Sequence, residues 1–215
     1  LKVMLSVGGW GSGRFSEMAM DRKLRRSFAD DCLRVVEEFG LDGIDIDWEY
    51  PTSPAAGISY SPEDTGNFTM LMKDLRQVLG DGLLLTFASA ASAEYVDFTA
   101  VEPYVDFVNI MAYDMATAPK HHSALYESEI SGMTPDKAAR AHLAAGMPAH
   151  KLVLGMPFYG RGSGRYADFN DFKDIKKDIE AYEIWDEKAQ VPYIADTDGT
   201  LIVGYDNPRS LKIKC

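Results

Sequence analysis

Apolar and polar positions alternate in a regular rhythm over residues 1–161. Short apolar runs predict five strands, at residues 3–7, 41–48, 83–88, 105–111 and 152–156. Between several of these runs, apolar residues recur at the spacing of one helix face. This spacing predicts helices at residues 21–39, 61–79 and 134–146, and a short one near 95–101. Gly40 is expected to end the first helix, while Ser61 and Pro62 are expected to cap and open the second.

This strand–helix repeat predicts a parallel sheet with helices outside it, because right-handed crossovers return each strand to the same sheet. Polar residues recur just after the strands, where a (β/α)8 barrel carries its active site. A doubly wound open sheet is the structural alternative. We disfavour it because no glycine-rich phosphate turn of the dinucleotide type is present. The predicted fold class is therefore α/β, with a TIM barrel architecture.

The rhythm breaks at Gly162. Residues 171–180 predict a charged helix, and residues 191–194 and 201–205 predict two strands joined by a turn at Asp198-Gly199. We interpret residues 162–206 as a small α+β insertion. Residues 1–161 then form the barrel portion that carries the active site, and residues 207–215 begin a further barrel helix.

One strand carries a column of acids. In the string DGIDIDWEYP at residues 42–51, alternation places Asp45, Asp47 and Glu49 on one face, and Ile44 with Trp48 on the other. Stacking carboxylates in a half-buried place costs free energy through desolvation and mutual repulsion. The column therefore predicts a catalytic site. Two alternatives remain open: a solvated edge strand, and a divalent-metal site, which would also use carboxylates.

Composition narrows the possible partners. The formal net charge of −11 argues against nucleic acid and anionic membranes, and it is compatible with a neutral or cationic substrate. Apolar runs such as residues 83–85 are too short to cross a bilayer. Cys32 and Cys215 are too few for a disulfide framework, and Cys32 falls at a core position of a predicted helix.

Several motifs together resemble one family. The string DGIDIDWEYP is similar to the DxxDxDxE motif of family 18 glycoside hydrolases, and its WEYP ending resembles the chitinase branch. SVGGW at residues 6–10, MAYD at 111–114 and GMPFYGR at 155–161 agree in order and spacing. WDEKAQVPY at residues 185–193 resembles part of the extra α+β domain of chitinases with deep clefts.

The resemblance implies an eight-stranded barrel, whereas five strands are predicted here. In family order they look like strands three to seven. A typical barrel needs about 250 residues. We therefore expect the 215-residue chain to be an incomplete part of a longer protein, and to be inactive alone.

The resemblance also implies a mechanism, in which the substrate's own 2-acetamido group attacks the anomeric carbon and the configuration is retained. Glu49 is expected to be the acid and base. Asp47 is expected to orient the acetamido N–H, and Asp45 to share a proton with Asp47. Ser6 and Asp42 are expected to support these acids.

Tyr113 resembles the family residue that donates its hydroxyl to the acetamido carbonyl. The resemblance implies further substrate-binding residues, which are Trp10, Met111, Asp114, Tyr159 and Arg161. Trp48 is expected in the core. His121 and His122 are expected to be solvated loop residues.

The predicted function is cleavage of β-1,4 bonds between N-acetylglucosamine units, without a cofactor. Chitin or chitooligosaccharides are the expected partners, with no nucleic acid and no membrane insertion. The resemblance implies a secreted or cell-envelope location. Two alternatives remain: an endo-β-N-acetylglucosaminidase that acts on N-glycans, and a non-catalytic chitin-binding lectin. Intact Glu49 disfavours the lectin.

Overall fold

The computed structural model describes all of residues 1–215, and the chain divides into two compact units. The first comprises residues 1–110 and 142–153, and the second comprises residues 111–141 and 154–215. Each unit is built around its own five-stranded sheet. None of the helices has both the length and the apolar composition that a membrane span requires.

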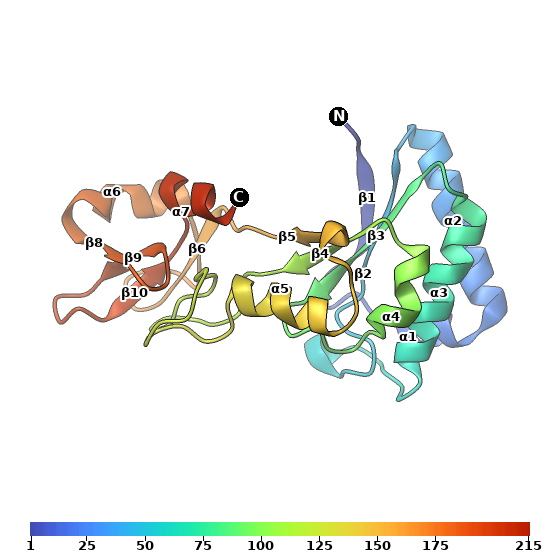
Figure 1. The fold of residues 1–215 in the computed structure, drawn as a ribbon, viewed down its shortest axis with the longest axis horizontal. Coiled ribbons are helices and arrows are strands. Elements are labelled where there is room, and N and C mark those ends of the chain that lie inside the picture. The colour runs from blue at the N-terminus through green and yellow to red at the C-terminus, as the bar shows by residue number, and fades with distance from the viewer. The chain divides into compact units, whose positions relative to one another are not determined.

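The first sheet has the strand order β1-β2-β3-β4-β5 (Figure 1). Its elements, in chain order, are β1 (Met4–Gly8), α1 (Phe15–Met20), α2 (Arg22–Phe39), β2 (Gly43–Asp47), η1 (Ala55–Gly57), α3 (Asp64–Leu79), β3 (Leu84–Ala90), α4 (Phe98–Val101), η2 (Glu102–Tyr104), β4 (Phe107–Met111), η3 (Ala149–Lys151) and β5 (Leu152–Leu154). Helix α5 (Pro135–Ala144) has residues in both units.

Strand β2 pairs in parallel with β1 on one side and with β3 on the other. Helices α1, α2 and α3 pack against one another, and Figure 1 shows α1 to α4 gathered on one side of this sheet. Asp21 caps α2 through its carboxylate, which accepts from the backbone N–H of Lys23 and Leu24. Gly40 ends α2 in the left-handed conformation, as the sequence predicts.

The core of the first unit lies between this sheet and its helices. Ile44, Ile46 and Trp48 are buried there, and the Trp48 ring stacks on Phe15 at 5.4 Å between centroids. The predicted core role of Trp48 is thus confirmed. Cys32 is also buried in this core. Burying one face of β2 leaves its acidic residues together on the other face.

The second unit holds an antiparallel sheet of order β7-β6-β10-β9-β8. Its elements are β6 (Tyr159–Gly162), β7 (Phe169–Asp171), α6 (Phe172–Tyr182), β8 (Glu183–Asp186), β9 (Val191–Ala195), β10 (Leu201–Gly204) and α7 (Pro208–Lys214). Ile175 of α6 packs with Ile194 and Val203 of the sheet. The helix and two strands predicted after residue 162 are therefore present.

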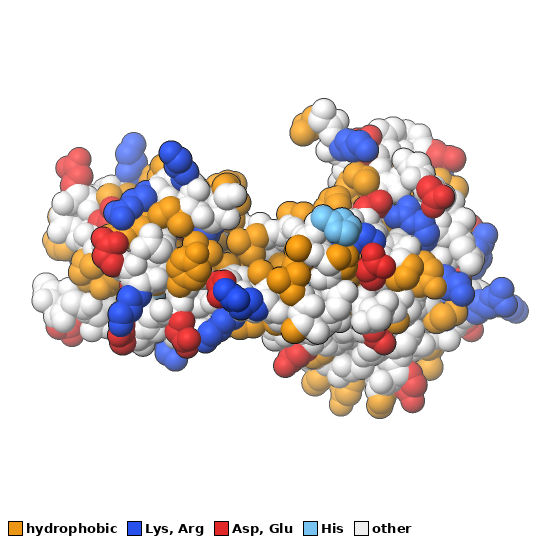
Figure 2. All heavy atoms as spheres, in the orientation of Figure 1, with side chains coloured by type: hydrophobic (Ala, Val, Ile, Leu, Met, Phe, Trp, Pro, Cys, Tyr) orange, Lys and Arg blue, Asp and Glu red, His pale blue; other side chains and the backbone are white.

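Several element boundaries differ from the prediction by one to three residues, and α1 was not predicted. Helix α3 begins at Asp64 rather than after Ser61, because the Asp64 carboxylate accepts from the Ser61 backbone N–H and holds residues 61–63 in a turn. Strand β2 ends at Asp47, so Glu49 lies beyond the strand end. The division at residues 161 and 206 stays a prediction. Figure 2 shows acidic and basic side chains interspersed over the visible face of each unit.

Candidate active site

The acids of β2 lie on the face that the core leaves open. Asp45, Asp47 and Glu49 are half-buried, while the residues between them are fully buried. Asp45 is the most firmly held. Its carboxylate accepts from Ser6 Oγ at 2.7 Å, Thr86 Oγ1 at 2.6 Å and Asn109 Nδ2 at 3.0 Å. The predicted contact of Ser6 with the deep aspartate is therefore present.

Strand register explains this convergence. Ser6 and Thr86 are the direct partners of Asp45 on β1 and β3, so their side chains point to the same face as Asp45. Sequence reasoning missed Thr86 and Asn109. A partial signal was available, since each is a polar residue in a mostly apolar strand, but only the register of the strands places it on the acid face.

Asp47 lies in a different environment. Burial, together with the charges of Glu49 and Asp45, raises the pKa of Asp47 from its ordinary 3.8 to about 6. Its Oδ1 atom is buried and has no hydrogen-bond partner. A buried carboxylate oxygen without a donor is costly, and a ligand that brings an N–H or O–H group would relieve that cost.

The glycine-rich loop after β1 lies directly against Asp47. The Gly9 backbone N–H donates to the Asp47 carbonyl oxygen at 2.8 Å. A Cβ on Gly8, which has φ of 128°, would lie 2.0 Å from the same carbonyl oxygen. Only glycine fits there, so the spacing of SVGGW reflects the close approach of two backbones. Asp42, directly before β2, contacts the chain directly before β1, since its carboxylate accepts from the Val3 N–H at 2.6 Å.

Glu49 is hydrogen-bonded to Tyr50, which belongs to a cluster of three aromatic rings. Tyr50 stacks on Tyr95 at 5.0 Å between centroids, and Trp10 meets Tyr50 edge-on at 6.4 Å. Burial, a hydrogen bond to Glu49 and the charges of Glu49 and Asp47 raise the pKa of Tyr50 above its usual range. Trp10 is 66% exposed, so its ring can pack against a ligand. The sequence reasoning did not single out Tyr50 or Tyr95.

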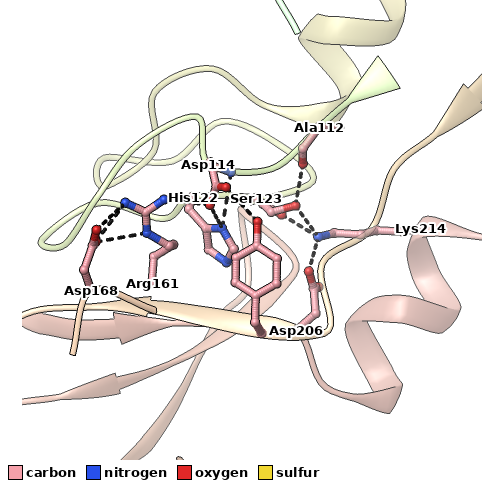
Figure 3. Close-up of polar contacts among 9 residues, drawn as sticks. Ala112, Asp114, His122, Ser123, Arg161, Asp168, Asp206 and Lys214 are labelled. Atoms are coloured by element: carbon pink, nitrogen blue, oxygen red, sulfur yellow. Dashed lines mark hydrogen bonds and ion pairs between the residues drawn. The ribbon is translucent and has the colours of Figure 1, made fainter. Parts of the chain in front are cut away.

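In the second unit, two other predicted site residues bind the carboxylate of Asp114 (Figure 3). Tyr159 donates its hydroxyl to Asp114 at 2.8 Å, and Arg161 Nη1 lies 2.8 Å from the other carboxylate oxygen. Burial alone would raise the pKa of Asp114. Hydrogen bonds from His122, Tyr159 and Arg161, with the charge of Arg161, outweigh burial and lower it to about 2. Asp114 is therefore a fixed anion.

The expectation of solvated histidines is wrong. His121 and His122 are each 1% exposed. His122 Nδ1 lies 3.4 Å from the Asp114 backbone N and 3.6 Å from its carboxylate, while His121 Nε2 lies 3.2 Å from Asp186. A loop position favoured solvation, but Asp186 and Tyr193 contact His121 in the folded unit, and Tyr159 packs against His122.

A buried lysine, Lys214, contacts the segment between β4 and α5 that also carries Asp114 (Figure 3). Lys214 near the end of α7 pairs with Asp206 at 2.6 Å, and both side chains are almost fully buried. Its ammonium group also donates to the Ser123 carbonyl and hydroxyl, and Ser123 in turn donates to the Ala112 carbonyl. Ala112 precedes Tyr113 and Asp114, so this network fixes the backbone from which they project.

Tyr113 and Met111 stand close to Asp114 along the chain. Met111 is the last residue of β4, and the Tyr113 ring meets the Tyr159 ring edge-on at 6.4 Å. Of the predicted site residues, the structure thus assembles two groups. Asp45, Asp47, Glu49, Ser6, Asp42 and Trp10 lie in the first unit, and Met111, Tyr113, Asp114, Tyr159 and Arg161 lie in the second.

A carboxylate cluster at the carboxyl end of a parallel barrel strand is typical of glycoside hydrolases. A sequence model described as "Glycosyl hydrolases family 18" matches residues 1–215, so the chain belongs to that family.

Among proteins of known identity, Chitinase A1 of Niallia circulans is 35% identical over the whole of this chain and 38% of its own length. An endochitinase of Manduca sexta is 30% identical over the whole of this chain and 47% of its own length. The chain therefore spans less than half the length of these two relatives.

Solved structures of family 18 proteins are similar to this chain in fold and sequence. A family 18 N-acetylglucosaminidase from Paenibacillus barengoltzii is 33% identical with a TM-score of 0.87, matching all of this chain and 73% of that one. A Group IV chitinase of Ostrinia furnacalis in complex with allosamidin is 30% identical with a TM-score of 0.87, matching 68% of its chain. The predicted fold class, a partial (β/α) barrel with an α+β insertion, is confirmed.

Proposed function

We propose that the protein is a chitinase-like glycoside hydrolase that cleaves β-1,4 bonds between N-acetylglucosamine units. The observation that carries this proposal is the unpartnered, buried Oδ1 of Asp47. The acetamido N–H of an N-acetylated sugar is a donor that this oxygen lacks. Chitinases among the relatives support the same substrate class.

In the proposed reaction, Glu49 protonates the glycosidic oxygen as the bond to the anomeric carbon breaks. The acetamido carbonyl oxygen attacks that carbon and forms an oxazolinium ion, and Asp47 accepts the acetamido N–H and balances the positive charge. Glu49 then takes a proton from a water molecule. The water oxygen attacks the anomeric carbon and opens the oxazolinium ring, so the configuration at that carbon is retained. No cofactor enters any of these steps.

Asp45 is proposed to support Asp47. Hydrogen bonds from Ser6, Thr86 and Asn109 keep the Asp45 carboxylate in a fixed position. Sharing of a proton between Asp45 and Asp47 remains part of the proposal.

Tyr113 is proposed to donate its hydroxyl to the acetamido carbonyl. Met111, Asp114, Tyr159 and Arg161 are proposed to bind the sugar, with Trp10 as a stacking surface. We also propose a secreted or cell-envelope location, on the family resemblance alone.

The test is release of a fluorophore from an N-acetylchitobioside by the natural-length protein and its Glu49→Gln variant. We expect the variant to lose activity by at least about a hundredfold, because loss of a general acid costs about 10²–10⁴ in rate. Asp81→Asn is the matched control, since Asp81 is an exposed acid in the turn before β3 and belongs to neither group of site residues. Equal activity of Glu49→Gln and the unmodified protein would contradict the acid assignment.

Activity on a high-mannose glycopeptide with none on chitooligosaccharides would favour the endo-β-N-acetylglucosaminidase. Sugar binding without any turnover in the unmodified protein would favour the lectin.

A further inference from the structure

Phe169 is a large apolar side chain that the second unit leaves in solvent. It opens β7, and 57% of its surface is exposed, whereas its neighbour Asn170 is 6% exposed. The proposed reaction assigns no role to Phe169. A single exposed apolar side chain is ordinary on a protein surface, so a role for Phe169 depends on its neighbours.

Strand register places Phe169 on the same face as two proposed sugar-binding residues. Arg161 on β6 is the direct antiparallel partner of Phe169 on β7, and Tyr159 lies two residues before Arg161 on β6. All three side chains therefore project from one face of the sheet. The opposite face carries Gly160, which lies against Ile175 of α6.

The Phe169 ring is held in place by its neighbours. The Arg161 guanidinium lies over the ring at 4.0 Å from its centroid, and the Tyr159 ring lies 5.6 Å away. Arg161 is itself fixed, because Asp114 binds Nη1 while Asp168 binds Nε and Nη2. An aromatic ring held in this way loses little freedom when a ligand packs on it.

The Arg161 guanidinium contacts both Asp114 and the Phe169 ring. Asp114 and Asp168 bind different edges of this one planar group, and Phe169 follows Asp168 in the chain. Asp114 therefore lies at one edge of the guanidinium, whereas the Phe169 ring lies against its face. A neighbouring sugar unit of a longer chain, next to one that contacts Asp114 and Tyr159, is better placed to reach the ring.

We propose that Phe169 is an additional oligosaccharide-binding residue, whose exposed ring packs on a sugar unit next to the one bound by Asp114 and Tyr159. This inference rests on the proposed function. It assigns the β6–β7 edge of the insertion to recognition of chain length. The ligand class is a neutral oligosaccharide, whose C–H faces suit an aromatic ring and whose hydroxyls suit the polar groups beside it.

The experiment is calorimetric titration of the natural-length protein carrying Glu49→Gln, with N-acetylglucosamine oligomers from the disaccharide to the hexasaccharide. We expect Phe169→Ala to weaken hexasaccharide binding about tenfold, the order of one aromatic contact, and to leave disaccharide binding unchanged. Phe169→Tyr should restore the hexasaccharide affinity.

Tyr182→Ala is the matched control. Tyr182 is 44% exposed, and Arg165 lies over its ring at 4.9 Å from the centroid. It therefore resembles Phe169 in exposure and in its arginine contact, but that arginine does not bind Asp114. Its loss should not change affinity for any oligomer.

Equal weakening of all oligomers by Phe169→Ala would mean that Phe169 acts only by holding Arg161, and would overturn the proposal. Equal binding by Phe169→Ala and its parent would overturn it too. If neither binds any oligomer, the proposed function itself falls, together with the inference.

Discussion

Asp45 and Asp47 stand two residues apart on one strand, yet their surroundings differ. Three donors satisfy Asp45, whereas Asp47 keeps a buried oxygen without a partner and a pKa raised to about 6. Two aspartates on one strand thus differ in hydrogen bonding and in pKa, because β1 and β3 supply hydroxyls and β4 supplies an amide only to the deeper acid.

This difference predicts a pH-dependent gain in stability for Asp47→Asn. The pKa of Asp47 is raised from 3.8 to about 6 in the folded protein, so its protonated form favours folding. That contribution is complete below about pH 4 and is lost as pH rises through 6. At pH 8, Asp47→Asn should therefore be more stable by about 1–3 kcal/mol, allowing for partial solvent screening.

Urea unfolding of the natural-length protein between pH 3.5 and 8 measures this effect. Asp81→Asn, which changes an exposed acid in the turn before β3, is the control and should show no such trend. A gain for Asp47→Asn of the same size at every pH would contradict the raised pKa.

Among the elements, α7 is anchored by polar side chains. Asn207 caps its N-terminus, and Lys214 in its last turn pairs with buried Asp206 and binds Ser123. One short helix thereby fixes the loop that carries Tyr113 and Asp114. A buried ion pair of this kind is expensive to break, because one charge is left without compensation.

Lys214→Met should therefore destabilise the protein by about 3–5 kcal/mol, the usual cost of breaking a buried pair. Lys212→Met, in the same turn but exposed, should change the free energy of unfolding by less than about 0.5 kcal/mol. Guanidinium unfolding at neutral pH compares the two.

The double variant Lys214→Met/Asp206→Leu separates pairing from packing. Because it removes both charges, it should recover part of the loss. A loss as large as in Lys214→Met would show that packing of the lysine stem, rather than the pair, holds α7.

At the scale of the whole molecule, the formal charge of −11 is spread over a chain with acids and bases interspersed on the visible face of each unit (Figure 2). Such a charge repels polyanions but exerts little net force on an uncharged sugar. The proposed ligand is neutral, so long-range attraction is not needed for its capture.

Affinity of the Glu49→Gln variant for a chitooligosaccharide should therefore change less than about twofold between 0.05 and 0.5 M salt, although the Debye length falls several-fold over this range. Calorimetry at both salt concentrations tests this. A steep decline with salt would indicate that a charged ligand, rather than a neutral oligosaccharide, is the natural one.

Local sequence was enough to predict the strands, most helices, the acid face of β2 and the family. Each depends on local alternation, on capping residues such as Gly40, or on motifs that survive as short strings. Local patterns could not place Thr86 and Asn109 on Asp45, because that contact needs the register of neighbouring strands. Nor could they bury His121 and His122, pair Lys214 with Asp206, or set Arg161 over Phe169. These contacts form only when the chain folds, since burial and charge pairing depend on residues far apart in the sequence.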